Sequence, residues 1–257
     1  MSKSYFSEES IEQLKGGLSP VLRGLRDLQA RALSHGFASD VAREYAYQGF
    51  GRRLDTCRRC VSRVFDLIPV DLEGVPNDDA RKDAELHIHA FLLAVYGALD
   101  NLALVWVKER EIIKPNGNPL NSSYIGFRPG NSIVRESLPD ALQKKLAGYD
   151  GWFGQHEDYR HALAHRIAPY IPPYAVDPEK AGLEADLGRQ SLEALFHGDI
   201  PKHQELEREQ LALRRFLPFI QHSWGQPATP VVFHAMLLAD SNTLIEIGAD
   251  VLDLLAA

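Results

Sequence analysis

The sequence predicts an all-α protein: an antiparallel helical bundle with additional peripheral helices and one long loop near residues 114–131. Apolar residues recur every three or four positions in several long segments, which is the spacing of one buried helix face. The most apolar run, FLLAVYGALDNLALVWV at residues 91–107, carries Asp100 and Asn101 at its middle. A central carboxylate is costly in a membrane, so this run fits a buried helix of a soluble bundle. No segment alternates strongly enough to predict a sheet.

The first half of the chain predicts three helices in order. Residues 7–34 have helical apolar spacing, which Pro20 could kink or break. A second helix begins with Ser39 or Asp40 as its cap and runs to about Leu67. The third runs from about Asp78 to Ile113 and holds the apolar run at its centre.

The second half predicts shorter helices around a polar loop. Residues 114–131 are rich in Pro, Gly, Asn and Ser and form the loop. Helices follow at about 139–147 and 152–167, and the second ends at the four prolines of PYIPPYAVDP. Polar helical segments occupy 178–196 and 202–215, residues 216–221 could be extended, HSWGQPATP is a loop, and a last helix spans 231–254. We expect one domain over 1–257, with a bundle core at 38–170 and 231–254 and a helical addition at 178–222.

The bulk composition limits the classes of function. The chain has 257 residues, 45% of them hydrophobic, and a formal net charge of −7. This charge has the wrong sign for general nucleic-acid binding, so any contact with RNA needs a local basic patch. The first residues do not resemble a signal peptide, and two cysteines without an export signal indicate the cytoplasm and no membrane association. Phosphate-loop, dinucleotide-binding, serine-hydrolase and H-E-x-x-H motifs are absent from the sequence.

Two features of the second helix have mainly structural interpretations. Cys57 and Cys60 form a CxxC pair, but no second pair exists to complete a zinc site, so core thiols are expected. Arg52, Arg59 and Arg63 fall on one side of the helix, with Arg53 and Arg58 nearby. They could seat phosphates, although such a stripe is more often a solvated face.

The third helix carries four polar residues on one face. Glu85, His89, Tyr96 and Asp100 are separated by 4, 7 and 4 positions. A buried carboxylate needs an arginine, a histidine or a metal, so Asp100 is either part of a site or an anchor for a neighbouring arginine.

The stretch DYRHALAHR, residues 158–166, concentrates imidazole and guanidinium groups on one helix. Asp158, His161 and His165 lie within about 60° of one another on an ideal helix. Two imidazoles can move protons at neutral pH, and Arg160 can hold a phosphate and stabilise transition-state charge. These groups suffice to cleave RNA through its own 2′-hydroxyl without a metal. Alternatively, Arg160 pairs with Asp100 and the histidines fill polar corners of the bundle.

RHALAH, residues 160–165, resembles the R-x4-H signature of HEPN domains, including a polar residue directly after the arginine. The run AHRIAPYIPPY at 164–174 is also similar to a set of uncharacterised bacterial proteins. The resemblance implies a helical bundle, usually a dimer, in which two motifs face each other and form a metal-independent ribonuclease site. Many HEPN proteins belong to toxin–antitoxin, phage-defence or RNA-processing systems, and others have lost catalysis and act as binding modules.

The resemblance implies catalytic roles for Arg160 and His165, with His161 at the polar motif position. Asp100 is added as their acidic partner from the helix pattern. Contacts with an RNA substrate are expected from Arg166, Asn101 and His89. The expected protein is a homodimeric endoribonuclease with no cofactor, and an antitoxin or other protein partner is possible.

Two alternatives stay open. A non-catalytic helical module of the same type would bind protein or RNA, with Arg160 and Asp100 as a buried pair. A metal-dependent bundle enzyme would use Asp158, His161 and His165, with His89 from the facing helix, as oxygen and nitrogen ligands.

Overall fold

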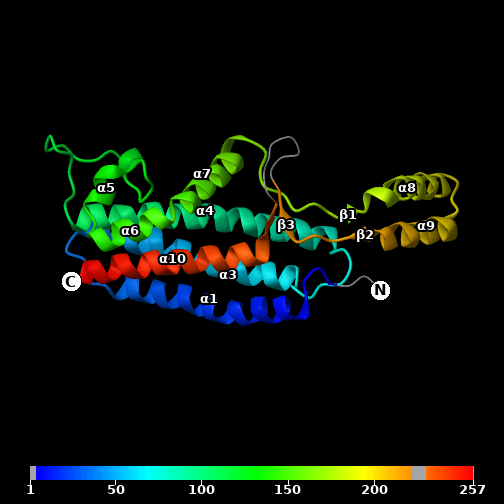
Figure 1. Ribbon diagram of the computed structural model, residues 1–257, viewed down its shortest axis with the longest axis horizontal. Helices are drawn as coiled ribbons and strands as arrows, with labels where there is room; N and C mark the ends of the chain where they lie inside the picture. The colour runs from blue at the N-terminus through cyan, green and yellow to red at the C-terminus, as the bar shows by residue number, and fades with distance from the viewer. Residues whose placement is uncertain (1–3, 222–229, 257) are drawn as a thin grey trace.

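The computed structural model describes residues 4–221 and 230–256, and they form an all-α fold, as the sequence predicts. Four long helices lie side by side in the bundle (Figure 1): α1 (Glu8–Ser34), α3 (Arg52–Leu67), α4 (Asp78–Glu109) and α10 (Phe233–Ala256). The strands are four two-residue segments that form two antiparallel pairs within the described ranges: β1 (Ala175–Val176) with β2 (Arg214–Arg215), and β3 (Phe219–Ile220) with β4 (Val231–Val232).

Helix α1 packs in the bundle, although the bundle core was expected only at 38–170 and 231–254. Ser7 caps it by accepting from the backbone N–H of Ser10, and Pro20 lies inside it without ending it. Val21 and Leu25 are buried on the face that packs against α3 and α10. Pro20 is exposed, so its ring is on the solvent side of α1.

The second predicted helix is continuous but changes its winding. It consists of α2 (Asp40–Glu44), a π-helix η1 (Tyr45–Gly51) and α3. Ser39 caps α2, in agreement with the sequence. A π-helix adds a residue to each turn and is frequent at functional sites. Gly49 lies in η1, where an added Cβ atom would stand 2.8 Å from the side-chain amide of Asn101, so the glycine permits close contact with α4.

Helix α4 is the central element. Asn77 caps its N-terminus, and fourteen of its 32 residues are buried. By length and composition α4 could cross a membrane, but 67% of its most apolar window is buried inside the protein, as in the core helix of a soluble bundle. It ends at Glu109, four residues before the predicted end, because Glu111 adopts a left-handed backbone conformation (φ 49°).

The predicted loop at 114–131 contains one short 3-10 helix, η2 (Ser122–Tyr124). It is followed by α5 (Ser132–Glu136), α6 (Asp140–Gly148) and α7 (Asp150–His165). The last two match the helices expected near 139–147 and 152–167, and α7 packs on α4. Five-residue α5 was not predicted, because one turn leaves no periodicity to detect.

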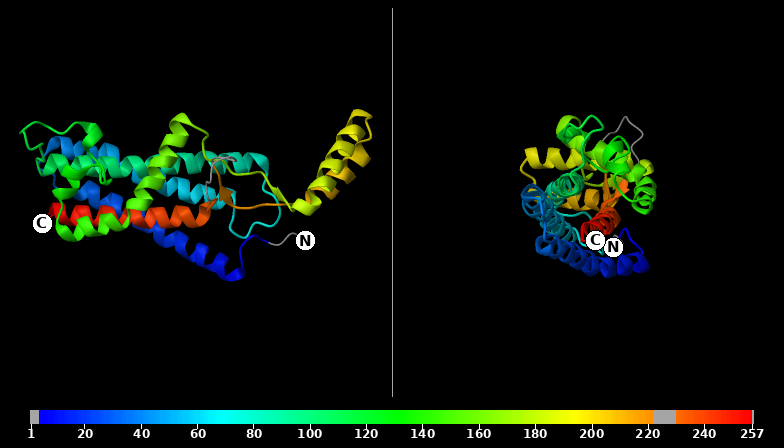
Figure 2. Two further views of the ribbon diagram at one scale, coloured as in Figure 1. Left: turned by 45° about the horizontal axis from the view of Figure 1, so that its top comes forward. Right: turned by 90° about the vertical axis from the view of Figure 1, so that its left-hand side faces the viewer.

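The helical addition forms a separate hairpin that projects from one end of the bundle (Figure 2). A 3-10 turn η3 (Pro178–Lys180) leads into α8 (Ala181–Phe196), and α9 (Ile200–Leu213) returns antiparallel to it. Gly198 makes the turn with φ 73°, which glycine adopts without strain. The strands β1 and β2 close the base of the hairpin.

The chain returns to the bundle through a short extended piece. Residues 219–220 form β3, within the segment 216–221 where extended structure was expected. Most of the HSWGQPATP loop, residues 222–229, lies outside the described residues. The last helix begins at Phe233 rather than 231 because residues 231–232 pair with β3.

Candidate functional site

One side of α4 gathers the polar residues that the sequence singled out. Asp100 keeps 36% of its side-chain surface exposed and has three guanidinium groups near it, from Arg53, Arg128 and Arg160. Burial raises the pKa of the Asp100 carboxyl, and the three arginines partly oppose that rise. We call Tyr96, Asp100, Arg128 and Arg160 the arginine cluster. It brings residues of α4, α7 and the 114–131 loop together.

Arg128 contributes most of the contacts in the arginine cluster. Its Nη1 donates to Glu157 Oε1 at 2.8 Å and to the Tyr96 hydroxyl, and its Nη2 lies 4.0 Å from Asp100 Oδ1. The sequence analysis missed Arg128. The available signal was a single arginine in a loop that is rich in Pro, Gly, Asn and Ser.

Arg160 lies over Tyr96 and not in an ion pair with Asp100. Its guanidinium carbon is 5.2 Å from the centre of the Tyr96 ring, and that of Arg128 is 5.1 Å from the same centre. Arg160 is exposed and, within the described residues, has no carboxylate at ion-pair distance. The buried Arg160–Asp100 pair that one alternative required is therefore not formed. Among the described residues, Arg128 is paired with Glu157, so the charge of Arg160 is the one in this cluster that an added anion can neutralise.

The two motif histidines are accessible at the end of α7. The ring centres of His161 and His165 are 6.2 Å apart, with His161 half-buried and His165 exposed. Across residues 4–221 and 230–256, neither imidazole forms a hydrogen bond or ion pair. Asp158 lies 3.8 Å from Arg166, which follows α7 in an extended conformation. Within the described residues, Arg160 thus lies over Tyr96, and the two imidazoles have only each other as a ring contact.

Two other predicted residues hold the chain in place after α7. His89 Nε2 bonds the backbone oxygen of Pro169, and Glu85 Oε2 accepts from the backbone N–H of Ile171 at 2.8 Å. Both side chains fix the proline segment against α4. The structure thus gives His89 a positioning contact with the proline segment, and its expected contact with a substrate stays a prediction.

The metal-ligand set that the sequence allowed does not assemble. No group of three or more His, Cys, Asp or Glu side chains within the described part of the chain is arranged to hold a metal ion. His89 is engaged with Pro169, and Asp158 with Arg166. A pair that the sequence analysis missed, His156 and Asp240 at 3.2 Å, is buried between α7 and α10 and receives a hydrogen bond from Trp152.

The CxxC pair consists of core thiols, as expected. Cys57 and Cys60 are buried and free of disulfide bonds. Burial raises the pKa of both thiols, to about 11 for Cys60, so neither is a thiolate at neutral pH.

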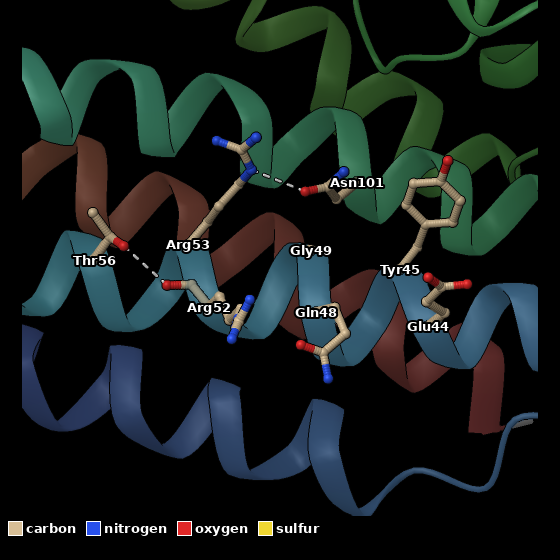
Figure 3. Close-up of a pocket in the computed structure, with 8 residues that line it drawn as sticks. All are labelled: Glu44, Tyr45, Gln48, Gly49, Arg52, Arg53, Thr56 and Asn101. Atoms are coloured by element: carbon tan, nitrogen blue, oxygen red, sulfur yellow. Dashed lines mark hydrogen bonds between the residues drawn. The ribbon is translucent and has the colours of Figure 1, made fainter.

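Two hollows adjoin this side of α4. The first, of about 480 Å³, is lined by η1, the start of α3 and Asn101 (Figure 3). There Asn101 Oδ1 accepts from Arg53 Nε at 2.9 Å. The second, of about 410 Å³, is lined by residues that include Arg128, Glu157 and Tyr124. Asn101, expected to contact the substrate, thus belongs to the first hollow.

Comparison with known proteins adds no assignment. No protein-family model matches the chain, no curated protein matches its sequence, and no solved structure matches its fold. The function must be argued from the site alone.

Proposed function

We propose that the protein is a HEPN-like, metal-independent endoribonuclease that acts as a cytoplasmic homodimer. The observation that carries the proposal is the exposure of Arg160, fixed over Tyr96 beside Asp100 and Arg128, with His165 accessible five residues further along α7. The arginines supply the local positive charge that the acidic chain needs to bind RNA.

The proposed reaction uses the 2′-hydroxyl of the RNA as nucleophile. An imidazole removes the 2′-hydroxyl proton as the oxygen attacks phosphorus, and the bond to the 5′-oxygen breaks as that oxygen receives a proton. The products are a 2′,3′-cyclic phosphate and a 5′-hydroxyl. His165 acts as general acid or base, His161 assists, and Arg160 and Arg128 hold the phosphate.

Dimerisation completes the site in this proposal. In the described residues neither imidazole is hydrogen-bonded to Arg160, so we expect the motif of a second copy to bring an imidazole and an arginine to the same phosphate. The charge of Asp100 keeps Arg128 and Arg160 beside Tyr96, and Arg166 contacts the flanking phosphate. The resemblance to HEPN domains suggests the biological setting of this activity: a toxin with its antitoxin, phage defence or RNA processing.

The test is cleavage of labelled tRNAs and mRNAs by the purified protein in excess EDTA. His165→Ala and Arg160→Ala are each expected to lower the rate at least 100-fold. His197→Ala and Arg59→Ala are matched controls, because both side chains are exposed and lie outside the arginine cluster. Cleavage that needs a metal, or that persists in both motif variants, contradicts the proposal. Light scattering establishes whether the active species is a dimer.

A non-catalytic RNA-binding module is the second candidate. It is favoured by one observation, that His161 and His165 form no hydrogen bond or ion pair in the described chain. RNA binding without cleavage, weakened in Arg160→Ala and unchanged in His165→Ala, identifies this function.

A further inference from the structure

The 480 Å³ hollow beside η1 contains two arginines that the proposed cleavage does not use. Arg52 and Arg53 line it together with Tyr45, Gly49 and Asn101 (Figure 3). Elsewhere on α3, Arg58 is 2.7 Å from Asp55 and Arg63 is 3.6 Å from Asp66. Arg52 and Arg53 have no carboxylate at ion-pair distance anywhere in the described ranges. Two arginines against one carboxylate, Glu44, give the lining of the hollow a net positive charge.

Arg53 is held in position by polar contacts that leave its charge available. Its Nε donates to Asn101 Oδ1 at 2.9 Å and its Nη1 to the backbone oxygen of Leu93 at 3.4 Å. The guanidinium lies against Gly97, where an added Cβ atom would come within 2.4 Å of it. A guanidinium fixed in this way loses little side-chain entropy when it binds an anion. Within the described residues its Nη2 forms no hydrogen bond and can donate to an oxygen in the hollow.

The remaining lining favours an organic anion over a bare ion. Tyr45 is half-buried, stands across the hollow from Arg53 and has no aromatic partner among the described rings. A flat group can stack on it. Glu44 is the one carboxylate of the lining and can accept from a hydroxyl group. Gly49 adds no side chain to the space between them.

We propose that this hollow binds a small phosphomonoester that carries an aromatic ring and a hydroxyl group. Arg53 donates to the phosphate, Arg52 adds positive charge to the same lining, Tyr45 stacks on the ring, and Glu44 accepts from the hydroxyl. A volume of about 480 Å³ lies in the range of small-molecule sites. Guanidinium groups match the geometry of a phosphate with paired hydrogen bonds. This site requires neither the motif histidines nor a second copy of the chain.

The test is isothermal titration calorimetry of the full chain with adenosine 5′-monophosphate, phenyl phosphate, adenosine, inorganic phosphate and an octamer of uridylate. We expect the two aromatic phosphomonoesters to bind more tightly than adenosine or inorganic phosphate. Arg52→Met and Arg53→Met are each expected to weaken their binding about tenfold to 100-fold. Arg59→Met is the matched control, because Arg59 is exposed on the same helix, lacks an ion pair among the described residues and lies outside the hollow.

Two results overturn the inference. One is no binding of either phosphomonoester at millimolar concentration, or binding that Arg52→Met leaves unchanged. The other is binding of the octamer alone, which would make the hollow a seat for a nucleic-acid backbone. Arg52 is exposed, so its replacement tests the site even if Arg53→Met lowers stability. His165→Ala is expected to retain phosphomonoester binding, which separates this inference from the proposed cleavage.

Discussion

The bundle and the α8–α9 hairpin are both helical, but they bury very different fractions of their residues. Helix α4 buries fourteen of its 32 residues, whereas α8 and α9 bury three of 30, Leu187, Ser191 and Leu206. Helix α4 contacts α3, α10 and α7, while the main partner of α8 is α9. A helix surrounded on several sides can hold side chains in fixed positions, which is why the arginine cluster and the 480 Å³ hollow both lie on α4.

Several polar contacts join the helices of the hairpin and its base. Glu184 accepts from Arg214 at 2.7 Å and from Gln210 at 3.0 Å, and Ser191 is 2.8 Å from His203 Nδ1. Leu187 and Leu206 are buried, but other large apolar residues of the hairpin remain exposed, with Phe196 82% and Leu192 54% accessible. The comparison teaches that this region can unfold locally while the bundle stays intact.

The largest expected effect is in the centre of the bundle. Phe91→Ala removes a fully buried ring from α4 and is expected to lower the free energy of unfolding by about 3–5 kcal/mol. Denaturant titration measures this. Near the midpoint of unfolding, the same change is also expected to reduce ligand binding at the arginine cluster and at the 480 Å³ hollow, because both depend on folded α4. A loss below about 1 kcal/mol would mean that the bundle is loosely packed.

A pH effect of about 3 kcal/mol is expected from His234 in the bundle. Burial lowers its pKa to about 4, and its Nε2 donates to the backbone oxygen of Ile68 at 2.7 Å. Between pH 6.5 and 4 the unfolded chain binds a proton that the folded chain does not, so stability falls as the pH falls. His234→Gln is expected to flatten this dependence when unfolding is measured across that range. An unchanged slope would assign the acid sensitivity to other groups.

A smaller and local effect is expected in the hairpin. Leu206→Ala removes its best-buried apolar side chain and is expected to cost about 2–3 kcal/mol. Because α8 and α9 are held mainly by each other, the loss should appear as faster amide exchange over 181–213. The midpoint of unfolding of the bundle should not change, and neither should the rate of RNA cleavage. A matching drop in the stability of α4 would show that the two regions unfold as one unit.

The smallest effect is expected at the tip of the hairpin. Phe196→Ser replaces an exposed side chain and should change stability by less than about 0.5 kcal/mol. Thermal unfolding followed by circular dichroism measures it. A larger loss would show that another surface covers Phe196 in solution, because the side chain is 82% exposed in this structure.

The sequence predicted most helices and singled out three of the four residues of the arginine cluster, Tyr96, Asp100 and Arg160. Ser39 and the spacing of apolar residues located helices correctly, because caps and amphipathic faces are local features. It did not predict η1, because a π-helix depends on packing against α4 at Gly49 and Asn101. It also missed Arg128, whose contacts lie 29 and 32 residues away in the chain.

The sequence by itself determined the all-α class, the core position of α4 and the presence of two histidines and two arginines in DYRHALAHR. The tertiary structure alone decided their surroundings. It placed Arg160 and Arg128 over Tyr96, engaged His89 with Pro169 and left Arg52 and Arg53 without carboxylate partners in the described chain. The reason is that helix formation depends on neighbours within four residues, whereas charge and burial depend on segments that meet only after folding.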